Sequence, residues 1–421
     1  MKKVLQPDYV SKFRCIASDC EDTCCCGWRV AIDEESYVKY QEFGRADGDG
    51  LFDGKLTREG IMPVEGDFAE VVLLPENTCP FLTEKKLCSI QKAYGEKYLS
   101  VTCGIFPRNF NMVNGNLELA LNLSCPHAAR LALLDPLPMR FSLADVRDDR
   151  RIDKISTLKK ADSEYPNRIY PYFEEVRAFV LSLLQSQNYC FEDRLVILGR
   201  FCNDLNLKHD APKAEILRLI NEYAQIVDSY GFNKFIGSIP NQPAALLKVL
   251  ITLIEYRLKT EVTNKRFLEC FDEFRYGLHY SNETPEEDLT VVYAKVKTDY
   301  YDRYMAQHEY ILENYFVNYI FKTLFPFGPQ RSIYSQDIFT VPETVFTEYM
   351  LLTLHYAIIK NLLVGIAGYY KEQFETRQVL KLIQSFEKNI GHDIPYLQRL
   401  LKFFDDNHMI TVAGAAMLIK N

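Results

Sequence analysis

The sequence predicts a mostly α-helical protein that begins with a small, cysteine-rich α+β unit, and two observations lead to this fold class. Nine of the twelve cysteines lie within the first 125 of the 421 residues, among short β-type runs and one hairpin signal. After about residue 160, apolar residues recur at helical spacing, and prolines stand where helices would begin. We therefore expect a cysteine-rich unit over 1–135, a charged junction over 136–165 and a multi-helix domain over 166–421.

Composition narrows the class of protein. The hydrophobic fraction of 48% and the charged fraction of 25% are ordinary for a soluble globular protein. A net charge of −8 argues against a general nucleic-acid binder, which needs a basic surface. The sequence contains neither the apolar core of a signal peptide at its start nor a run of about 18 apolar residues. We expect no membrane association and a cytoplasmic location, where thiols stay reduced.

The N-terminal unit is expected to contain short elements. Asp33 is placed to cap a helix over 34–43, because two acidic residues follow it in the first turn. Short strands are expected over 55–57 and 69–74. Asn114-Gly115 is a strong two-residue turn signal, and alternating leucines follow it, so a hairpin is expected over 110–123.

The rest of the chain has the pattern of packed helices. Prolines precede the expected helices over 213–228 and 244–259. Residues 289–324 are expected to form long helices that break near His308. In the stretch 345–366 apolar residues surround the helix, which predicts a central, buried one.

The cysteine spacing favours a metal or an iron–sulfur cluster over disulfides. Adjacent cysteines cannot easily pair with one another, and the expected compartment is reducing. The two C-x2-C halves typical of zinc ribbons are absent, whereas iron–sulfur clusters tolerate irregular spacing. Cys20-x3-Cys24 begins the pattern of radical enzymes that cleave S-adenosylmethionine, but Gly27 stands at the third ligand position. Cys190, Cys202 and Cys270 lie in apolar helical stretches and are expected to be buried thiols.

Several motifs together resemble the flagellin lysine-N-methylase family over nearly the whole length. They are Phe13-x-Cys15-Ile-x3-Cys20-Glu-x-Thr-Cys24-Cys25-x-Gly27-Trp28, Cys79-Pro-Phe-Leu, Leu87-Cys88-Ser-Ile-Gln, Tyr98-Leu-Ser-x-Thr-Cys103, Phe106-Pro-Arg108-x2-Asn111, Leu123-Ser-Cys125-Pro126 and Leu312-Glu-Asn314-Tyr315-x2-Asn318-Tyr319. The N-terminal part also resembles the zinc- or iron-chelating CxxCxxCC proteins. Cys26 occupies a variable position of the pattern, and His127 stands where an acid is expected.

The resemblance implies methyl transfer from S-adenosylmethionine to the side-chain amines of lysines on flagellin. It also implies an iron–sulfur cluster, of the four-iron (4Fe-4S) type, with zinc as the alternative. The expected metal ligands come from a set of eight cysteines, and one or two metal sites are both open: Cys15, Cys20, Cys24, Cys25, Cys79, Cys88, Cys103 and Cys125. The cluster is expected either to be structural or to hold the amino-carboxylate end of the cofactor.

Amine methylation needs a neutral lysine nitrogen, whose ordinary pKa is about 10.4, so a site must desolvate the ammonium or supply a base. Asn314 and Asn318 lie four residues apart and would share one helix face, with Tyr315 and Tyr319 on the adjacent face. We name these four residues as catalytic candidates. The alternative is that the tyrosines pack and the asparagines bind neighbouring backbone.

Three N-terminal residues are candidates for binding S-adenosylmethionine: Trp28, Arg108 and Asn111. Trp28 would stack on the adenine or only shield the cluster. Arg108 would hold the cofactor carboxylate through its planar fork, or pair with a nearby acid.

Two functions of other classes compete with the methyltransferase. One is a metal- or cluster-carrying protein that binds a partner without chemistry. The other is an electron-transfer protein, which would leave the long helical part without a purpose.

Overall fold

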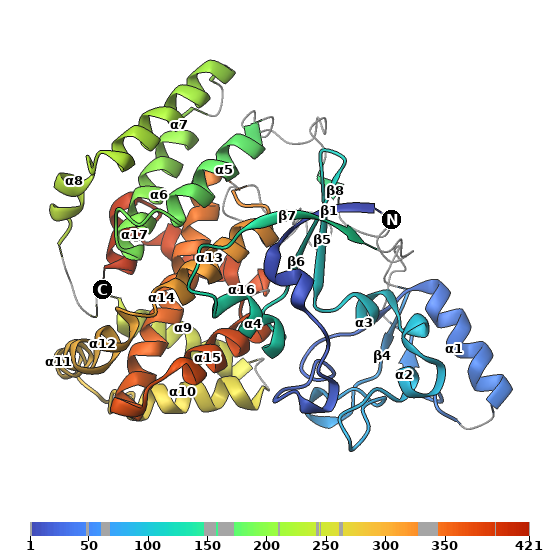
Figure 1. Ribbon diagram of the computed structural model, residues 1–421. Coiled ribbons are helices and arrows are strands. Elements are labelled where there is room, and N and C mark those ends of the chain that lie inside the picture. The colour runs from blue at the N-terminus through green and yellow to red at the C-terminus, as the bar shows by residue number, and fades with distance from the viewer. Residues whose placement is uncertain are drawn as a thin grey trace. The chain divides into compact units, whose positions relative to one another are not determined.

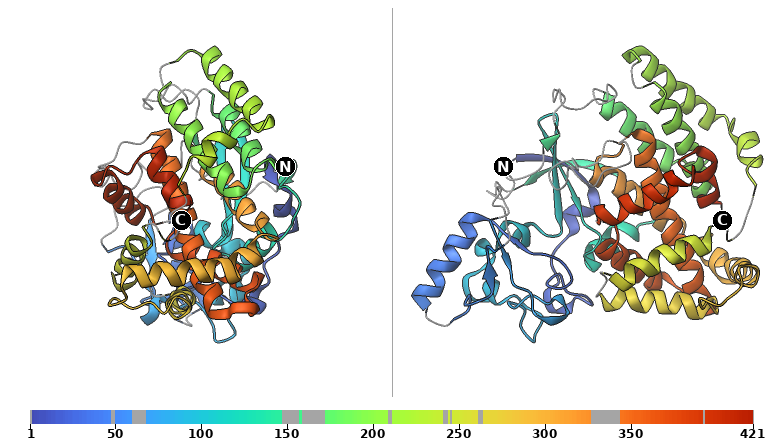
Figure 2. Two further views of the ribbon diagram at one scale, coloured as in Figure 1. Left: turned by 90° about the vertical axis from the view of Figure 1, so that its left-hand side faces the viewer. Right: turned by 180° about the vertical axis from the view of Figure 1, so that it is seen from behind.

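The computed structural model describes residues 2–47, 50–59, 68–146, 157–158, 172–208, 211–240, 244, 246–260, 264–326, 344–391 and 393–420. The chain forms two compact units. The N-terminal unit comprises Met1–Leu131 and Phe141–Leu158, and the helical unit comprises Ala132–Arg140 and Lys159–Asn421. The sequence predicts a junction over 136–165. In the structure, Phe141–Leu158 belongs to the N-terminal unit. Strands occur in the blue-to-teal part of the chain, and the green-to-red part is helical (Figures 1 and 2).

A five-stranded sheet lies in the N-terminal unit, in the order β7-β1-β6-β5-β8. Its strands are β1 (Lys2–Pro7), β5 (Arg108–Val113), β6 (Asn116–Leu121), β7 (Phe141–Val146) and β8 (Thr157–Leu158). The predicted hairpin is confirmed as β5 and β6, and Asn114 and Gly115 take the positive φ angles of 50° and 84° that its turn requires. Strand β1 was not predicted. It runs parallel to β6 and antiparallel to β7, and both partners come from distant parts of the chain.

A smaller sheet has the order β2-β4-β3. Its strands are β2 (Ala31–Ile32), β3 (Leu56–Thr57) and β4 (Ala69–Val71), and the helices of the unit are α1 (Glu34–Asp47), α2 (Ser89–Tyr94), α3 (Val101–Ile105) and α4 (Pro126–Leu133). The Oδ1 atom of Asp33 accepts the Ser36 amide at 3.1 Å, as expected for a helix cap. Its Oδ2 atom accepts the Val101 amide at 2.9 Å, so this one carboxylate also fixes the start of α3.

The second unit is helical in the described residues. Its helices are α5 (Phe173–Leu184), α6 (Phe191–Asn206), α7 (Lys213–Asp228), α8 (Asn233–Gly237), α9 (Leu247–Thr260), α10 (Lys265–Gly277), α11 (Glu286–Val296), the π-helical turn η7 (Lys297–Tyr301), α12 (Asp302–Met305), α13 (Tyr310–Thr323), α14 (Val345–Tyr370), α15 (Thr376–Asn389), α16 (Ile394–Asp406) and α17 (Val412–Ile419). The predicted break near His308 is confirmed, because α12 ends before it and α13 begins after it.

Helix α14 is the centre of this unit, as the sequence predicted. Every residue from Val345 to Gly368 is buried, and the helix packs against α6, α10, α11, α15 and α17. Among the described residues, the stretch 345–373 is long and apolar enough to cross a membrane, but its most apolar window is completely buried in the protein. It is therefore a buried core helix of this unit.

Three glycines let α10 and α14 cross in backbone contact. A Cβ atom added at Gly277 would lie 1.8 Å from the carbonyl oxygen of Gly365, and one added at Gly368 would lie 2.6 Å from the carbonyl oxygen of Gly277. No side chain fits between the two helices at this point. The crossing therefore depends on glycine at these positions.

Candidate functional site

The cysteines of the N-terminal unit are carried by loops that are tied to one another. Cys26 forms a β-bridge with Thr78, and the amide of Cys79 donates to the carbonyl oxygen of Cys25 at 2.9 Å. These contacts hold the segment 24–26 against the segment 77–79. Further along, Cys88 is the N-cap residue of α2, Cys103 lies in α3 and Cys125 directly precedes α4.

Five thiols of this unit lie within electrostatic range of one another: Cys24, Cys25, Cys79, Cys88 and Cys103. The sulfurs of Cys24 and Cys25 approach to 4.0 Å. The pKa of Cys25 is raised by its contact with Cys24, by burial and by the charges of Cys24, Cys79 and Cys103. Desolvation, together with the charges of Cys88, Cys79 and Cys24, raises the pKa of Cys103 to about 12.

The remaining candidate ligands relate to this group in different ways. Burial first, and the charge of Cys24 among other causes, raise the pKa values of Cys20 and Cys125, so both thiols lie within electrostatic range. Cys15 is exposed, and its sulfur accepts the amide of Ala17 at 3.4 Å. The Cys26 sulfur lies 3.5 Å from the Thr78 hydroxyl.

The thiols are the donor set that either a metal ion or an iron–sulfur cluster would use. Among the described residues, no three His, Cys, Asp or Glu side chains are arranged to hold one metal ion. Thiolates around one zinc lie about 3.8 Å apart, given Zn–S bonds of about 2.3 Å, whereas a cluster places its four thiolates around a larger core. Backbone amides also donate to the sulfurs of Cys20, Cys79, Cys88 and Cys125. Such hydrogen bonds are a means by which proteins tune iron–sulfur clusters.

The three proposed cofactor-binding residues lie in two places: Trp28 in the first cysteine-rich loop, and Arg108 and Asn111 in β5. The indole Nε1 of Trp28 donates to the carbonyl oxygen of Cys24 at 2.6 Å, which places the ring over the thiol-bearing loop. Arg108 and Asn111 both lie in β5, three positions apart, so their side chains point to opposite faces of the strand. The Arg108 guanidinium lies 5.5 Å from the centre of the Phe13 ring.

The four catalytic candidates are all buried in α13. The Asn314 amide donates to the backbone carbonyl oxygens of Leu133, at 3.3 Å, and Asp135, at 2.8 Å. The Tyr315 hydroxyl donates to Glu387 at 2.7 Å. Asn318 and Tyr319 are also buried, and the Tyr319 ring lies 5.2 Å from the ring of His355. Asn314 and Tyr315 thus have the partners that a packing role requires.

Glu387 is the centre of a buried polar cluster that sequence reasoning missed. Lys322 donates to its Oε2 atom at 2.6 Å while Tyr315 occupies Oε1. Burial alone would raise the pKa of Glu387, but Lys322 and the Tyr315 hydrogen bond hold it below its usual value. The carboxylate is therefore ionised in the core. No sequence signal links Lys322 with Glu387, because the contact joins two helices that are distant along the chain.

His355 lies beside this cluster, fully buried between the rings of Tyr319 and Phe386. Neither ring nitrogen has a hydrogen-bond partner. Burial lowers the pKa of His355 to about 4, against a raising effect of Glu387. The imidazole is therefore neutral at pH 7.

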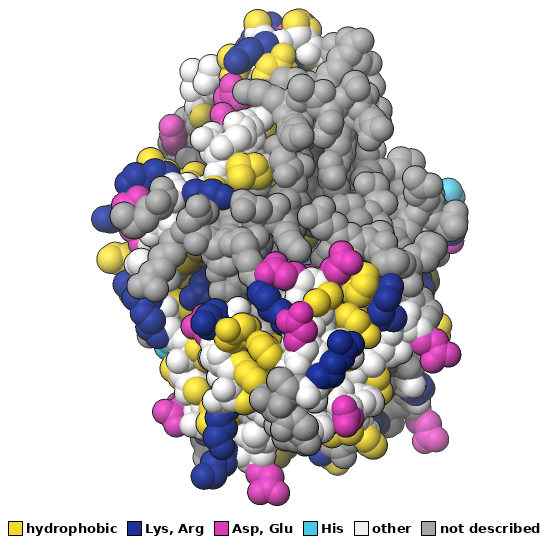
Figure 3. Space-filling model, turned by 90° about the vertical axis from the view of Figure 1, so that its right-hand side faces the viewer, with side chains coloured by type: hydrophobic (Ala, Val, Ile, Leu, Met, Phe, Trp, Pro, Cys, Tyr) yellow, Lys and Arg dark blue, Asp and Glu magenta, His cyan; other side chains and the backbone are white. Residues whose placement is uncertain are grey.

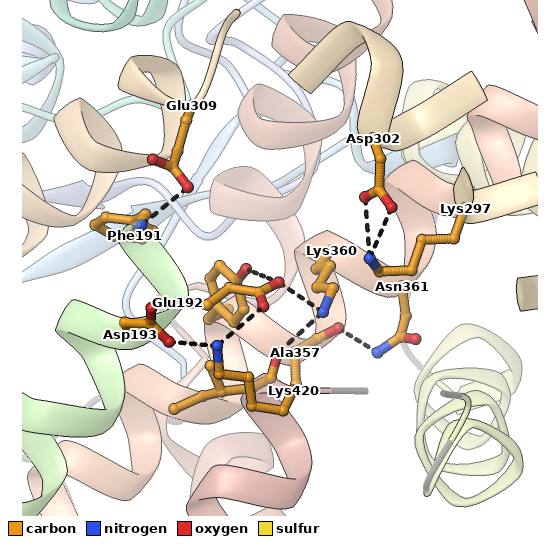
Figure 4. A network of polar contacts seen from close by, with 12 residues as sticks. Phe191, Glu192, Asp193, Lys297, Asp302, Glu309, Ala357, Lys360, Asn361 and Lys420 are labelled. Atoms are coloured by element: carbon orange, nitrogen blue, oxygen red, sulfur yellow. Dashed lines mark hydrogen bonds and ion pairs between the residues drawn. The ribbon is translucent and has the colours of Figure 1, made fainter. Parts of the chain in front are cut away.

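A second buried network joins α6, α14 and the end of α17 (Figure 4). Lys360 donates to Glu192 at 2.8 Å and to the backbone carbonyl oxygen of Ile419 at 2.9 Å. Lys420 pairs with Asp193 in the same place. This network contains more titratable groups than the α13 face that the sequence indicated.

The face of the molecule seen from the α1 side in Figure 1 mixes both signs of charge. In Figure 3, basic and acidic side chains alternate there with small hydrophobic patches. In the part of this face that the structure describes, no large patch of one charge is present.

Comparison with known proteins finds a family of domains that matches most of the helical unit. Residues 177–418 match the family described as the FliB lysine N-methylase C-terminal domain. The protein therefore belongs to the FliB lysine N-methylase family, as the sequence motifs had indicated. No solved structure matches it.

Two Salmonella relatives illustrate the likeness. A lysine-N-methylase of Salmonella typhimurium is 32% identical over 143 residues, which are 33% of this chain and 34% of that protein. The flagellar biosynthetic protein FliU of Salmonella muenchen is 32% identical over 137 residues, 32% of this chain and 78% of that protein. The match thus spans about a third of the lysine-N-methylase.

Proposed function

We propose that this protein transfers methyl groups from S-adenosylmethionine to the side-chain amines of lysines on flagellin. The observation that carries the proposal is the match of residues 177–418 to the lysine N-methylase domain. The names of the two relatives, a lysine-N-methylase and a flagellar biosynthetic protein, support the acceptor and its biological context.

We further propose that the N-terminal cysteines hold an iron–sulfur cluster of the four-iron type. The ligands would come from the five thiols of Cys24, Cys25, Cys79, Cys88 and Cys103, with Cys20 and Cys125 within reach. Bound there, the cluster would fix the loops of the unit or hold the amino-carboxylate end of the cofactor. Zinc is the alternative, and the 4.0 Å approach of Cys24 to Cys25 is the observation that favours it.

The chemistry requires a neutral acceptor amine. The lysine nitrogen attacks the methyl carbon of the sulfonium in line, a new N–C bond forms as the S–C bond breaks, and the amine proton passes to a base or to water. No net electron is transferred, so activity should persist without a reductant. A strict requirement for a strong reductant would contradict this polar mechanism.

One experiment tests the activity. Purified protein is incubated with flagellin and methyl-labelled S-adenosylmethionine, and the label on flagellin is mapped by peptide mass spectrometry. We expect label on lysine nitrogens, and none on flagellin whose lysines have first been acetylated. Protein that binds flagellin but transfers no label would support the non-catalytic binding protein instead.

A second experiment tests the metal. The protein is purified without oxygen, and iron, sulfide and zinc are counted in the sample used for the visible spectrum. We expect a brown protein with about four iron and four sulfide per chain. A colourless protein that contains zinc alone would replace the cluster with a zinc site.

A further inference from the structure

The buried network at the start of α6 surrounds an ammonium group that enters it from the protein surface. Asp193 and Glu192 lie in the first turn of α6, and Lys420 follows α17. The Nζ atom of Lys420 lies 2.5 Å from Asp193 and 3.8 Å from Glu192 (Figure 4). The Lys420 side chain is 19% exposed, and those of Asp193 and Glu192 are 19% and 25% exposed. The two carboxylates therefore flank one amine at a position that is partly exposed to solvent.

The other lysine of the network has a different role. Lys360 is completely buried, and its ammonium contacts Glu192 and the carbonyl oxygen of Ile419. Lys360 is not exposed to solvent and forms the buried side of the network. Its charge keeps Glu192 ionised, because Lys360 and Lys420 outweigh the effect of burial on the pKa of that carboxyl. Glu192 is thus an ionised carboxylate that interacts with the ammonium groups of both Lys360 and Lys420.

Tyr356 also contacts this network. The Tyr356 hydroxyl donates to the Oε1 atom of Glu192 at 3.0 Å. Burial, and then the charge of Glu192, raise the pKa values of Tyr293 and Tyr301, so both rings lie within electrostatic range of this carboxylate. Tyr301 belongs to the π-helical turn η7, a distortion that is frequent at functional sites.

Tyr293 carries a feature that the packed network does not explain. It is fully buried, yet its hydroxyl has no hydrogen-bond partner. A buried hydroxyl without a partner costs free energy and is expected where a ligand or a water molecule completes the site. Carboxylates, tyrosine hydroxyls and aromatic ring faces together are the groups that recognise an alkylammonium.

We propose that Glu192 and Asp193, with Tyr356 hydrogen-bonded to Glu192, form a binding site for the side-chain ammonium of a lysine from a protein substrate, and that Lys420 occupies this site from within the chain. The inference rests on the proposed function for the identity of the ligand. The Lys420 side chain blocks the site as an internal competitor, and an incoming lysine must displace it.

The first test is a binding measurement that needs no methyl transfer. The probe is Nα-acetyl-lysine methylamide, titrated by calorimetry into the full-length protein and into the Lys420→Met variant. We expect the variant to bind the probe about tenfold or more tightly than the wild type, equivalent to about 1.4 kcal/mol. Glu192→Gln in the Lys420→Met background should abolish this gain. Equal binding by wild type and Lys420→Met would overturn the proposal.

Matched controls separate this effect from a loss of charge. Lys402 forms an exposed ion pair with Asp406 in α16, and Lys402→Met should leave binding of the probe unchanged. Lys420→Arg keeps a cation in the site and should bind the probe as weakly as the wild type. A gain in Lys402→Met equal to that in Lys420→Met would also contradict the site.

The second test uses unaltered protein, so it holds even if the variants fold poorly. Trace acetylation by acetic anhydride reports the accessibility of Lys420, read by peptide mass spectrometry. Excess probe should speed acetylation of Lys420 at least about twofold relative to Lys402, whereas acetyl-norleucine methylamide should not, because it lacks the amine. No change at Lys420 would count against the site. Failure of the flagellin assay would leave both results standing, so the two proposals can fail separately.

Discussion

The two units of the protein arrange their titratable side chains in opposite ways. In the N-terminal unit like groups lie near one another: besides burial, the charges of Cys88 and Cys24 raise the pKa of Cys79, and those of Cys88, Cys79 and Cys24 raise the pKa of Cys103. In the helical unit opposite charges pair: Glu387 with Lys322, and Glu192 with Lys360. The helical unit thus neutralises its own buried charges. The N-terminal unit collects groups whose ionised forms an added cation would stabilise.

The largest expected effect tests the thiol group. We expect Cys24→Ala and Cys79→Ala each to abolish bound iron, and with it a contribution on the order of 10 kcal/mol to folding of the N-terminal unit. Metal counts, with hydrogen exchange at β4, measure both effects. Cys202→Ala, in the helical core, should retain the metal. Full iron content in both N-terminal variants would show that these thiols are not ligands.

The next effect tests the paired charges. Lys322→Met leaves the carboxylate of Glu387 buried without its cation, and we expect a loss of about 3–5 kcal/mol in the free energy of unfolding by urea. Lys39→Met removes a surface partner of Glu35 and should cost less than about 1 kcal/mol. Equal losses in the two variants would mean that the buried pair contributes no more to stability than the surface pair.

A smaller effect depends on pH. The pKa of His355 is about 4 in the folded protein and about 6.5 when unfolded, so between these values the unfolded chain binds more protons. Stability therefore falls as the pH drops through this window, by about 2 kcal/mol at pH 5 from His355 alone. Unfolding by urea at pH 7 and pH 5 should show a loss smaller by this amount in His355→Gln. The lowered pKa of Glu387 adds an acid loss of the same sign below its unfolded value, and both proteins share it.

The smallest effect distinguishes packing from catalysis on α13. Asn314→Ala leaves the carbonyl oxygens of Leu133 and Asp135 without this donor, and we expect a loss of about 1–2 kcal/mol in stability. Turnover per folded molecule on flagellin should stay within about twofold of the wild type if Asn314 only packs. A large fall in kcat with unchanged stability would restore its catalytic role.

Local signals in the sequence predicted much of the fold. Four features depend on neighbouring residues, and each was found: the Asn114-Gly115 turn, the Asp33 cap, the helix over 213–228 and the buried helix α14. Strand β1 was missed because its pairing with β6 and β7 is set by residues more than a hundred positions away. Short runs of this kind carry no periodicity of their own.

The candidate sites show the same limit. The spacing of the cysteines indicated a thiol-rich N-terminal unit, and the structure places five of these thiols within electrostatic range of one another. The sequence did not indicate a role for Glu387, His355 or Glu192. No local motif distinguishes a single buried acid or histidine from other residues of a helix. Their importance arises from partners such as Lys322 and Lys360, which only the packed helices supply.

The glycine crossing of α10 and α14 has a consequence for the order in which the chain folds. At this crossing, helix α10 packs against Gly365 and Gly368, which are synthesised much later than Gly277. At about 5–20 residues per second, α10 waits several seconds on the ribosome for its partner. Until then its apolar face, with Phe271 and Phe274, has no α14 to cover it, so the nascent helical unit is open to chaperones and to premature association.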